Sequence, residues 1–116
     1  MSKELVWGFT NRPTNKEQVC GCVGKGWHSL VSKLIDDLIA AGWDGCVFQV
    51  KEKFGGLRFY IGSGNEIIWE LISQAEKDSF HICEDCGEPG KLRTDGWWKT
   101  LCDIHGKDRP TENSIF

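Results

Sequence analysis

Apolar residues recur at helical spacing in two separate stretches of this chain. The first stretch has apolar side chains at Trp27, Leu30, Val31, Leu34, Ile35, Leu38 and Ile39. The second has them at Ile68, Leu71, Ile72 and Ala75. Gly42 favours a helix end, and Ser63 with Glu66 has the spacing of a capping box at a helix start. The pattern predicts two amphipathic helices, with Trp27 of the first and Trp69 of the second in the core.

Between the two helical stretches, the sequence KEKFGGLRFY (51–60) places a glycine pair between residues with strand propensity. Glycine readily adopts the positive φ angles that a two-residue hairpin turn needs. The sequence therefore predicts a β-hairpin with strands over about 46–54 and 57–61, joined by a turn at Gly55 and Gly56. In this register Phe54 lies opposite Leu57.

The side chains of such a hairpin alternate between two faces. The face predicted to join the core contains Phe48, Val50, Phe54, Leu57, Phe59 and Ile61, with the carboxylate of Glu52 among them. The other face contains Lys51, Lys53, Arg58 and Tyr60. Lys53 lies opposite Arg58 in this register, which costs stability unless an anion lies between the two. Two interpretations follow: a solvated basic face neutralised by the chain's own acids, or a docking face for an anionic or protein partner.

Length and charge restrict the class of protein. The chain has 116 residues and a formal net charge of −3, which fits one domain and is atypical of general nucleic-acid binders. The start MSKELVWGF lacks the apolar run of a signal peptide, and nowhere do about eighteen uncharged apolar residues follow one another. We therefore expect a cytoplasmic protein without a membrane partner.

The strongest chemical signal lies near the end of the chain. Cys83 and Cys86 form a Cys-x-x-Cys pair, and Cys102 and His105 form a Cys-x-x-His pair. Two chelating pairs of thiolate and imidazole donors suit tetrahedral zinc, and a shell filled by four protein ligands is typical of a structural site. The segment between the pairs predicts a hairpin, and Cys102 is expected to open a short helical turn. This layout is similar to a treble-clef finger, in which a knuckle and a helix start each supply one ligand pair.

The remaining cysteines allow two interpretations. Cys20, Cys22 and Cys46, together with His28, could supply a second zinc site, although Cys-x-Cys is a strained spacing for one ion. Alternatively they are free structural thiols, which a reducing compartment favours.

Together these elements predict an α+β fold organised as a single domain over residues 1–116. An irregular segment at 1–26 is followed by an α-β-β-α core at 27–80, the zinc finger at 81–109 and a frayed tail at 110–116. Trp97 and Trp98 are adjacent on a predicted strand of the finger, so they are expected to point to opposite faces and one of them to be exposed. Both are candidate binding residues, because Trp is enriched at interface hot spots.

Four stretches resemble a family of small zinc-binding proteins encoded by phages and prophages: GKGWHSLVSKL, VKEKFGGLRFY, SQAEKDSFHICEDCGEPGKLR and WWKTLCDIH. The similarity covers about residues 20–105 and is most specific at the hairpin and at the four zinc ligands. The resemblance implies a phage-type origin and a zinc-stabilised fold, and it assigns no catalytic residue. A small phage protein of this kind would act by binding a host or phage macromolecule, for instance as an inhibitor of a bacterial defence system.

The leading hypothesis is therefore a zinc-stabilised module that binds a protein partner. The runner-up is a nucleic-acid binder that uses an exposed Trp97 or Trp98 and the cations Lys51, Lys53, Arg58, Lys91, Arg93 and Lys99. A hydrolase or nuclease is a third hypothesis, but no set of side chains has an arrangement from which the sequence predicts catalysis. We predict no catalytic residue.

Overall fold

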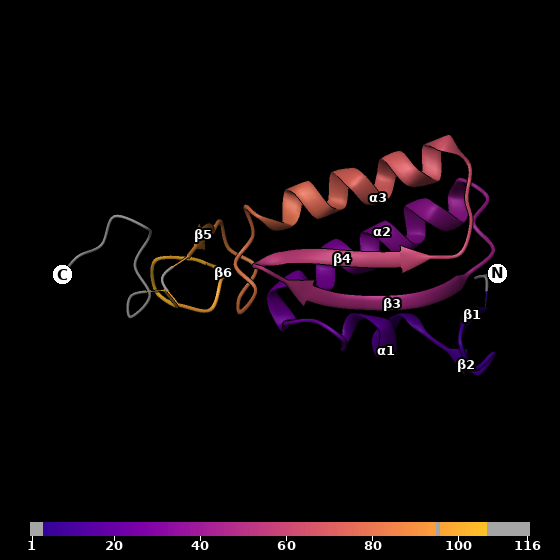
Figure 1. Ribbon diagram of the computed structural model, residues 1–116, viewed down its shortest axis with the longest axis horizontal. Coiled ribbons are helices and arrows are strands. Elements are labelled where there is room, and N and C mark those ends of the chain that lie inside the picture. Colours follow the sequence, from indigo (N-terminus) through magenta and orange to yellow (C-terminus); the bar gives the residue numbers. More distant parts are fainter. Residues whose placement is uncertain (1–3, 95, 107–116) are drawn as a thin grey trace.

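The computed structural model describes residues 4–94 and 96–106, and its centre is a four-stranded sheet with one long helix behind it and another along its edge (Figure 1). The strand order is β2-β1-β3-β4, and the elements are β1 (Leu5–Trp7), β2 (Pro13–Thr14), β3 (Cys46–Lys53) and β4 (Gly56–Ile61). The helices are α1 (Lys16–Cys20), the 3-10 turn η1 (Lys25–Trp27), α2 (His28–Ala40) and α3 (Glu66–Ser79). A separate two-stranded sheet of β5 (Lys91–Arg93) and β6 (Lys99–Leu101) follows. The predicted α+β class is confirmed.

The two long helices form where the apolar periodicity predicted them. Gly42, with a φ angle of 100°, follows the end of α2 as expected for a helix stop. α3 is capped by Asn65, whose side chain accepts a hydrogen bond from the N–H of Ile68 at 2.9 Å. The capping box expected from Ser63 is therefore wrong. Asn65 stands directly before the first helical residue, so its side chain reaches the free N–H group.

The hairpin turn lies one residue earlier than the sequence predicted. Lys53 pairs with Gly56, so Phe54 and Gly55 form the turn, with φ angles of 53° and 83°. Two left-handed residues are typical of a type I′ hairpin turn. Gly56 belongs to the strand instead, because a Cβ at this position would overlap the ring of Phe80. Tertiary packing therefore sets the register of this hairpin.

The corrected register shifts the pairing by an even number of residues, so most side chains keep their predicted face. Lys51, in place of Lys53, now lies opposite Arg58. Phe48 and Phe54 were expected in the core, and for both the prediction is wrong. A bulge in β3 turns half-buried Phe48 away from the core, and Phe54 is 61% exposed in the turn.

Helix α3 covers the free edge of β4. The N–H of Leu57 donates to Ser79 Oγ at 2.9 Å, and the N–H of Phe59 donates to Glu76 Oε2 at 3.1 Å. Side chains of the helix thus satisfy strand groups that would otherwise be open to pairing with another chain. The outer face of β3 and β4 has no helix over it in the described part of the chain, because α2 passes behind these strands (Figure 1).

The described part of the predicted irregular segment at 1–26 contains β1, β2, α1 and most of η1, so that prediction is wrong. β1 pairs in parallel with the start of β3, and Leu5 and Val19 are buried in the core. A strand of three residues is too short to show a period, and its partner lies far along the chain. Local sequence therefore had no signal for this pairing.

The core lies between the sheet and α2, and its largest fully buried side chains include Trp27, Trp43 and Phe59. The prediction for Trp27 is confirmed. Trp69 is instead 45% exposed, just outside the apolar stripe of α3, and its indole N–H donates to the carbonyl of Gly64 at 3.0 Å. Its predicted place in the core is therefore wrong.

Across the described ranges, no helix combines the length and the apolar character that crossing a membrane requires.

Candidate metal centre

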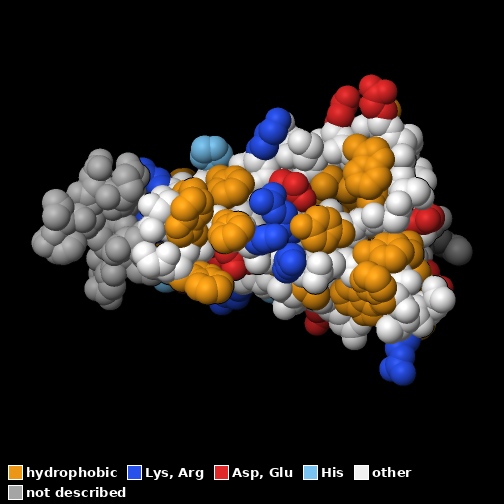
Figure 2. Space-filling view, in the orientation of Figure 1, with side chains coloured by type: hydrophobic (Ala, Val, Ile, Leu, Met, Phe, Trp, Pro, Cys, Tyr) orange, Lys and Arg blue, Asp and Glu red, His pale blue; other side chains and the backbone are white. Residues whose placement is uncertain are grey.

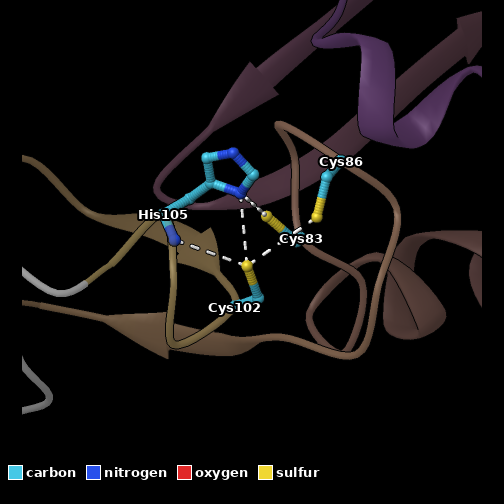
Figure 3. A group of neighbouring side chains, drawn as sticks. All are labelled: Cys83, Cys86, Cys102 and His105. Carbon is cyan, nitrogen blue, oxygen red and sulfur yellow. Dashed lines mark hydrogen bonds between the residues drawn. The ribbon is translucent and has the colours of Figure 1, made fainter.

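Side chains from two loops converge at one site (Figure 3). Cys83 and Cys86 come from the loop that follows α3, and Cys102 and His105 come from the turn that follows β6. Their Sγ atoms and an imidazole nitrogen all lie within 4.8 Å of one another. Cys86 Sγ lies 3.7 Å from Cys102 Sγ. His105 Nδ1 lies 3.2 Å from Cys102 Sγ and 3.7 Å from Cys83 Sγ. The four residues that the spacing predicted are close enough to bind one metal ion.

The first pair of ligands lies on a tight knuckle. The N–H of Gly87 donates to the carbonyl of Cys83 at 2.9 Å, and the N–H of Cys83 donates to the carbonyl of Glu88 at 2.8 Å. Gly87 has a φ angle of 87°, which a side chain would disfavour. The knuckle brings the second cysteine, Cys86, back over the first. Gly87 directly follows Cys86, so its backbone freedom allows the chain to close the knuckle.

The second pair lies on a single helical turn. The N–H of Gly106 donates to the carbonyl of Cys102 at 2.8 Å, and the N–H of His105 points at Cys102 Sγ at 3.4 Å. This agrees with the turn predicted to open at Cys102. The predicted tail at 110–116 lies outside the described residues.

Neighbouring groups shift the pKa values of two thiols in opposite directions. The backbone N–H of Glu88 lowers the pKa of Cys86, but burial and the nearby Cys83 and Cys102 thiols outweigh it and raise this pKa to about 11. The pKa of Cys102 is lowered, chiefly by the backbone N–H of His105. In the metal-free protein Cys86 therefore keeps its proton near neutral pH. Because thiolates bind metal and thiols do not, an incoming ion has to displace that proton.

Metal loading is expected to release at least one proton per chain, and metal affinity should fall as the pH is lowered. Below its raised pKa, the Cys86 thiol holds a proton that competes with the metal. Calorimetry of zinc binding in buffers with different ionisation enthalpies measures the proton count directly. Zinc uptake without proton release would contradict this thiolate site. A zinc affinity that does not change between about pH 6 and pH 8 would contradict it as well.

Buried hydrogen bonds attach the segment that carries the four candidate ligands to the start of α2. The N–H of Gly26 donates to the carbonyl of Glu84 at 2.7 Å. The indole N–H of Trp27, which is fully buried, donates to the carbonyl of Ile82 at 2.8 Å. Both contacts lie on the knuckle or directly before it, so the position of the metal site depends on the core of the domain.

The same segment is attached to the hairpin turn. The hydroxyl of Thr100 donates to the carbonyl of Gly55 at 2.7 Å, and the N–H of Thr100 donates to Glu84 Oε2 at 2.8 Å. Glu84 is buried, which raises its pKa, and Lys99 Nζ lies 3.9 Å from its other carboxylate oxygen. These contacts hold β6 and the hairpin turn in one fixed arrangement.

The other candidate binding residues lie on the outer face of the hairpin and beside it. Lys51 lies directly opposite Arg58, and its Nζ is 5.9 Å from the ring centroid of Tyr60, which is 40% exposed. Trp97 and Trp98 are 75% and 44% exposed. Neither tryptophan belongs to a strand, so the prediction that they alternate across a sheet is wrong. They lie in the β5–β6 loop, and both are accessible.

A hollow of about 810 Å³ separates the hairpin turn from the β5–β6 loop. Its lining consists of Glu52, Lys53, Phe54, Arg58, Phe80, Leu92, Gly96, Trp97 and Trp98. Figure 2 shows this side of the molecule, where hydrophobic side chains gather on both sides of a cluster of Lys and Arg. Phe80 and Leu92 were not predicted here, because both lie far from the hairpin in sequence. The one local signal was an aromatic residue directly after the second amphipathic helix.

The cations proposed for nucleic-acid binding do not form one surface. Arg93 is only 5% exposed, and its guanidinium donates to the carbonyl of Leu101 at 3.1 Å and pairs with Asp103 at 3.1 Å. Lys99 forms a salt bridge with Glu84. The prediction that Arg93 contacts a ligand is therefore wrong. Its side chain instead holds β6 to the turn that presents the second ligand pair.

The second metal site considered from the sequence is not formed. Among the described residues, the cluster at the end of the chain is the one Cys and His group compact enough to hold an ion. The thiol of Cys20 donates to the backbone carbonyl of His28 at 3.5 Å, and that of Cys22 to the carbonyl of Gln18 at 3.7 Å. Burial raises the pKa of both thiols, and Cys46 begins β3 apart from them. These cysteines are therefore free thiols.

No protein-family model matches the chain, and comparisons with curated proteins and with solved structures found no match either.

Proposed function

We propose that this protein is a zinc-stabilised module that binds a protein partner through the outer face of its hairpin. The observation that supports this most strongly is the hollow, where exposed Phe54, Trp97 and Trp98 stand beside Lys53 and Arg58. Protein interfaces combine an apolar, aromatic centre with a polar rim, and Trp, Tyr and Arg dominate their binding energy. An aromatic cluster of this kind on the surface is typical of an interaction site.

Zinc fits the donor set of the metal centre. In a tetrahedral site with Zn–S of about 2.3 Å and Zn–N of about 2.0 Å, two sulfurs lie about 3.8 Å apart and sulfur and nitrogen about 3.5 Å apart. The separation of 3.7 Å between Cys86 and Cys102 and those of 3.2 Å and 3.7 Å around His105 are close to these values. Because protein ligands fill all four positions, the ion would stabilise the fold and leave no place for a reacting water.

The order of knuckle, β5–β6 hairpin and helical turn supports the further proposal that this segment is a finger of treble-clef type. Its metal would fix one wall of the hollow, because Leu92, Trp97 and Trp98 belong to the finger and Phe54, Arg58 and Phe80 belong to the rest of the domain. The resemblance to phage-encoded proteins supports a partner from a bacterial host or a phage, in the bacterial cytoplasm. A component of a bacterial defence system is one such partner.

Capture of partners from a bacterial lysate by the zinc-loaded protein tests this function. Trp98→Ala and the double variant Lys51→Glu/Lys53→Glu should each lose the captured partner, identified by mass spectrometry. The double variant Lys25→Glu/Lys77→Glu makes the same change in net charge at exposed positions outside the hollow, and it should keep the partner. A partner that both hairpin variants still retain would contradict docking at this face.

The double variant Lys51→Glu/Lys53→Glu should leave the free energy of unfolding within about 1 kcal/mol of the parent value. In the described part of the chain neither Lys51 nor Lys53 has a salt-bridge partner. Glutamate at position 51 would also face Arg58, which replaces a pair of like charges by a pair of opposite ones. Urea denaturation measures the change. A loss of several kcal/mol would show that these lysines serve the fold and not a partner.

Phe54 offers a test in which stability and binding are expected to change in opposite directions. Its φ angle of 53° is unfavourable for a bulky residue, whereas Asn is favoured at this position of a type I′ turn. Phe54→Asn is therefore expected to relieve roughly 1 kcal/mol of backbone strain and to keep or raise the melting temperature. Capture of the partner should weaken. A variant that melts much lower and binds normally would show that the exposed ring serves only the fold.

A further inference from the structure

We infer that the hollow takes an acidic segment of the partner, which packs a large apolar side chain against Phe54 and Trp98 while its carboxylates contact Lys51 and Lys53. This inference rests on the proposed docking function and specifies the chemistry of the occupant. It follows from the shape of the hollow, from the charges at its rim and from the surroundings of the exposed rings.

The shape of the hollow favours an inserted apolar group. A volume of about 810 Å³ lies in the upper part of the range of ligand pockets, about 300 to 1,000 Å³, so the hollow holds several side chains of a peptide. Phe54 and Trp98 meet edge to face with ring centroids 6.0 Å apart, and Phe80 and Leu92 line the same hollow. Covering these surfaces with an apolar side chain removes them from water, which is the main source of affinity in such sites.

The charges at the rim favour carboxylates. Lys51 lies directly opposite Arg58, and such a pair of like charges is stabilised when an anion binds between them. Arg58 is partly neutralised by Glu76 at 3.9 Å, whereas Lys51 and Lys53 have no salt-bridge partner among the residues described. Glu52 also lines the hollow, but its Oε2 already accepts the N–H of Gly55 at 2.7 Å. Lys53 lines the hollow, and Lys51 lies opposite Arg58, which also lines it. Within the described ranges, two ammonium groups without a carboxylate partner are therefore available to an acidic segment.

The surroundings of the rings favour a peptide over single-stranded nucleic acid. Bases bind such surfaces by stacking on open ring faces along a positively charged groove. Here Lys51 Nζ lies 5.9 Å from the ring centroid of Tyr60, and Lys53 Nζ lies 5.7 Å from that of Phe54, so ammonium groups already lie over these two rings. The chain as a whole has a charge of −3, which repels a polyanion but opposes a short acidic peptide much less.

Selection from a library of random linear peptides against the zinc-loaded full chain tests this inference. We expect the enriched peptides to contain Asp or Glu close to one Trp, Phe, Tyr or Leu. The affinity of a labelled selected peptide should fall about tenfold or more when that apolar residue is replaced by Ala, and by a similar factor in Lys51→Glu/Lys53→Glu. It should also fall when salt is raised from about 50 mM to about 500 mM. Lys25→Glu/Lys77→Glu should change it less than about twofold.

The possible results distinguish failure of the inferred occupant from failure of the proposed docking function. Enriched peptides that are neutral or basic but still require Trp98 would overturn the acidic segment and leave the docking function standing. Peptides that bind Trp98→Ala and Lys51→Glu/Lys53→Glu as tightly as the parent would overturn both. Labelled oligothymidylate is the nucleic-acid probe. If it binds more tightly than the selected peptides, and Lys51→Glu/Lys53→Glu abolishes that binding, the inference is overturned in favour of nucleic acid. Failure to enrich any peptide would also contradict it. Melting curves confirm that each variant is folded.

Discussion

Cys86→Ser is expected to abolish tight zinc binding and to unfold the segment from the knuckle to the second ligand pair. The parent protein should contain one equivalent of zinc by elemental analysis, and the variant essentially none. The buried apolar cluster of this segment consists of only Cys83, Leu101 and Cys102, so apolar burial within the segment contributes little to its stability. Metal binding contributes on the order of 10 kcal/mol to the folding of such segments. Loss of the dispersed amide signals of residues 83–106 in an NMR spectrum would show the unfolding.

Cys22→Ser is the matched control for this experiment. Cys22 is exposed, outside the metal cluster, and donates only to a backbone carbonyl, so its variant should keep one equivalent of zinc and the parent melting curve. A parent protein that is fully folded after its metal has been removed by a chelator would contradict the proposed coupling of metal and fold. Two equivalents of zinc in the parent would contradict the assignment of Cys20, Cys22 and Cys46 as free thiols, because a second metal site would then exist.

Gly26→Ala is expected to destabilise the protein by about 3 kcal/mol or more, and to lower its melting temperature by about 10 °C or more. A Cβ at Gly26 would overlap the carbonyl oxygen of Cys83 and lie 2.6 Å from the nitrogen of Gly87. Both of these are backbone atoms of the knuckle and cannot move aside as a flexible side chain would. The clash would also break the hydrogen bond from the N–H of Gly26 to Glu84. Thermal and urea unfolding of the zinc-loaded variant measure the loss.

Gly21→Ala is the matched control, because its φ angle of −65° suits any residue and a Cβ there would come no closer than 3.4 Å to the Gln18 and Glu17 carbonyl oxygens. Its free energy of unfolding should stay within about 1 kcal/mol of the parent value. If Gly26→Ala and Gly21→Ala melt alike, the knuckle does not pack against η1 as described. The zinc content of Gly26→Ala distinguishes a displaced ligand-bearing segment, which would keep its metal, from an unfolded one.

The sequence by itself determined the features that depend on short separations along the chain. The apolar stripes of α2 and α3 repeat within a few residues, and the ligand pairs Cys83–Cys86 and Cys102–His105 are each separated by two residues. Helix faces and chelating pairs are set by local backbone geometry, so both could be predicted. The positive charge of the hairpin's outer face could also be predicted, because an even shift of register leaves each side chain on the same face.

Only the tertiary structure decided the features that depend on distant neighbours. Gly56 joins the strand because Phe80 occupies the space beside it, and that contact moves the turn to Phe54 and Gly55. β1 pairs with β3 across a long separation, and Arg93 is buried against the turn after β6. The hollow likewise lies between the hairpin turn and the β5–β6 loop, and the hydrogen bond from Thr100 to Gly55 joins these two distant segments. In each case the deciding energy is packing between segments remote in sequence, which no local pattern of residues records.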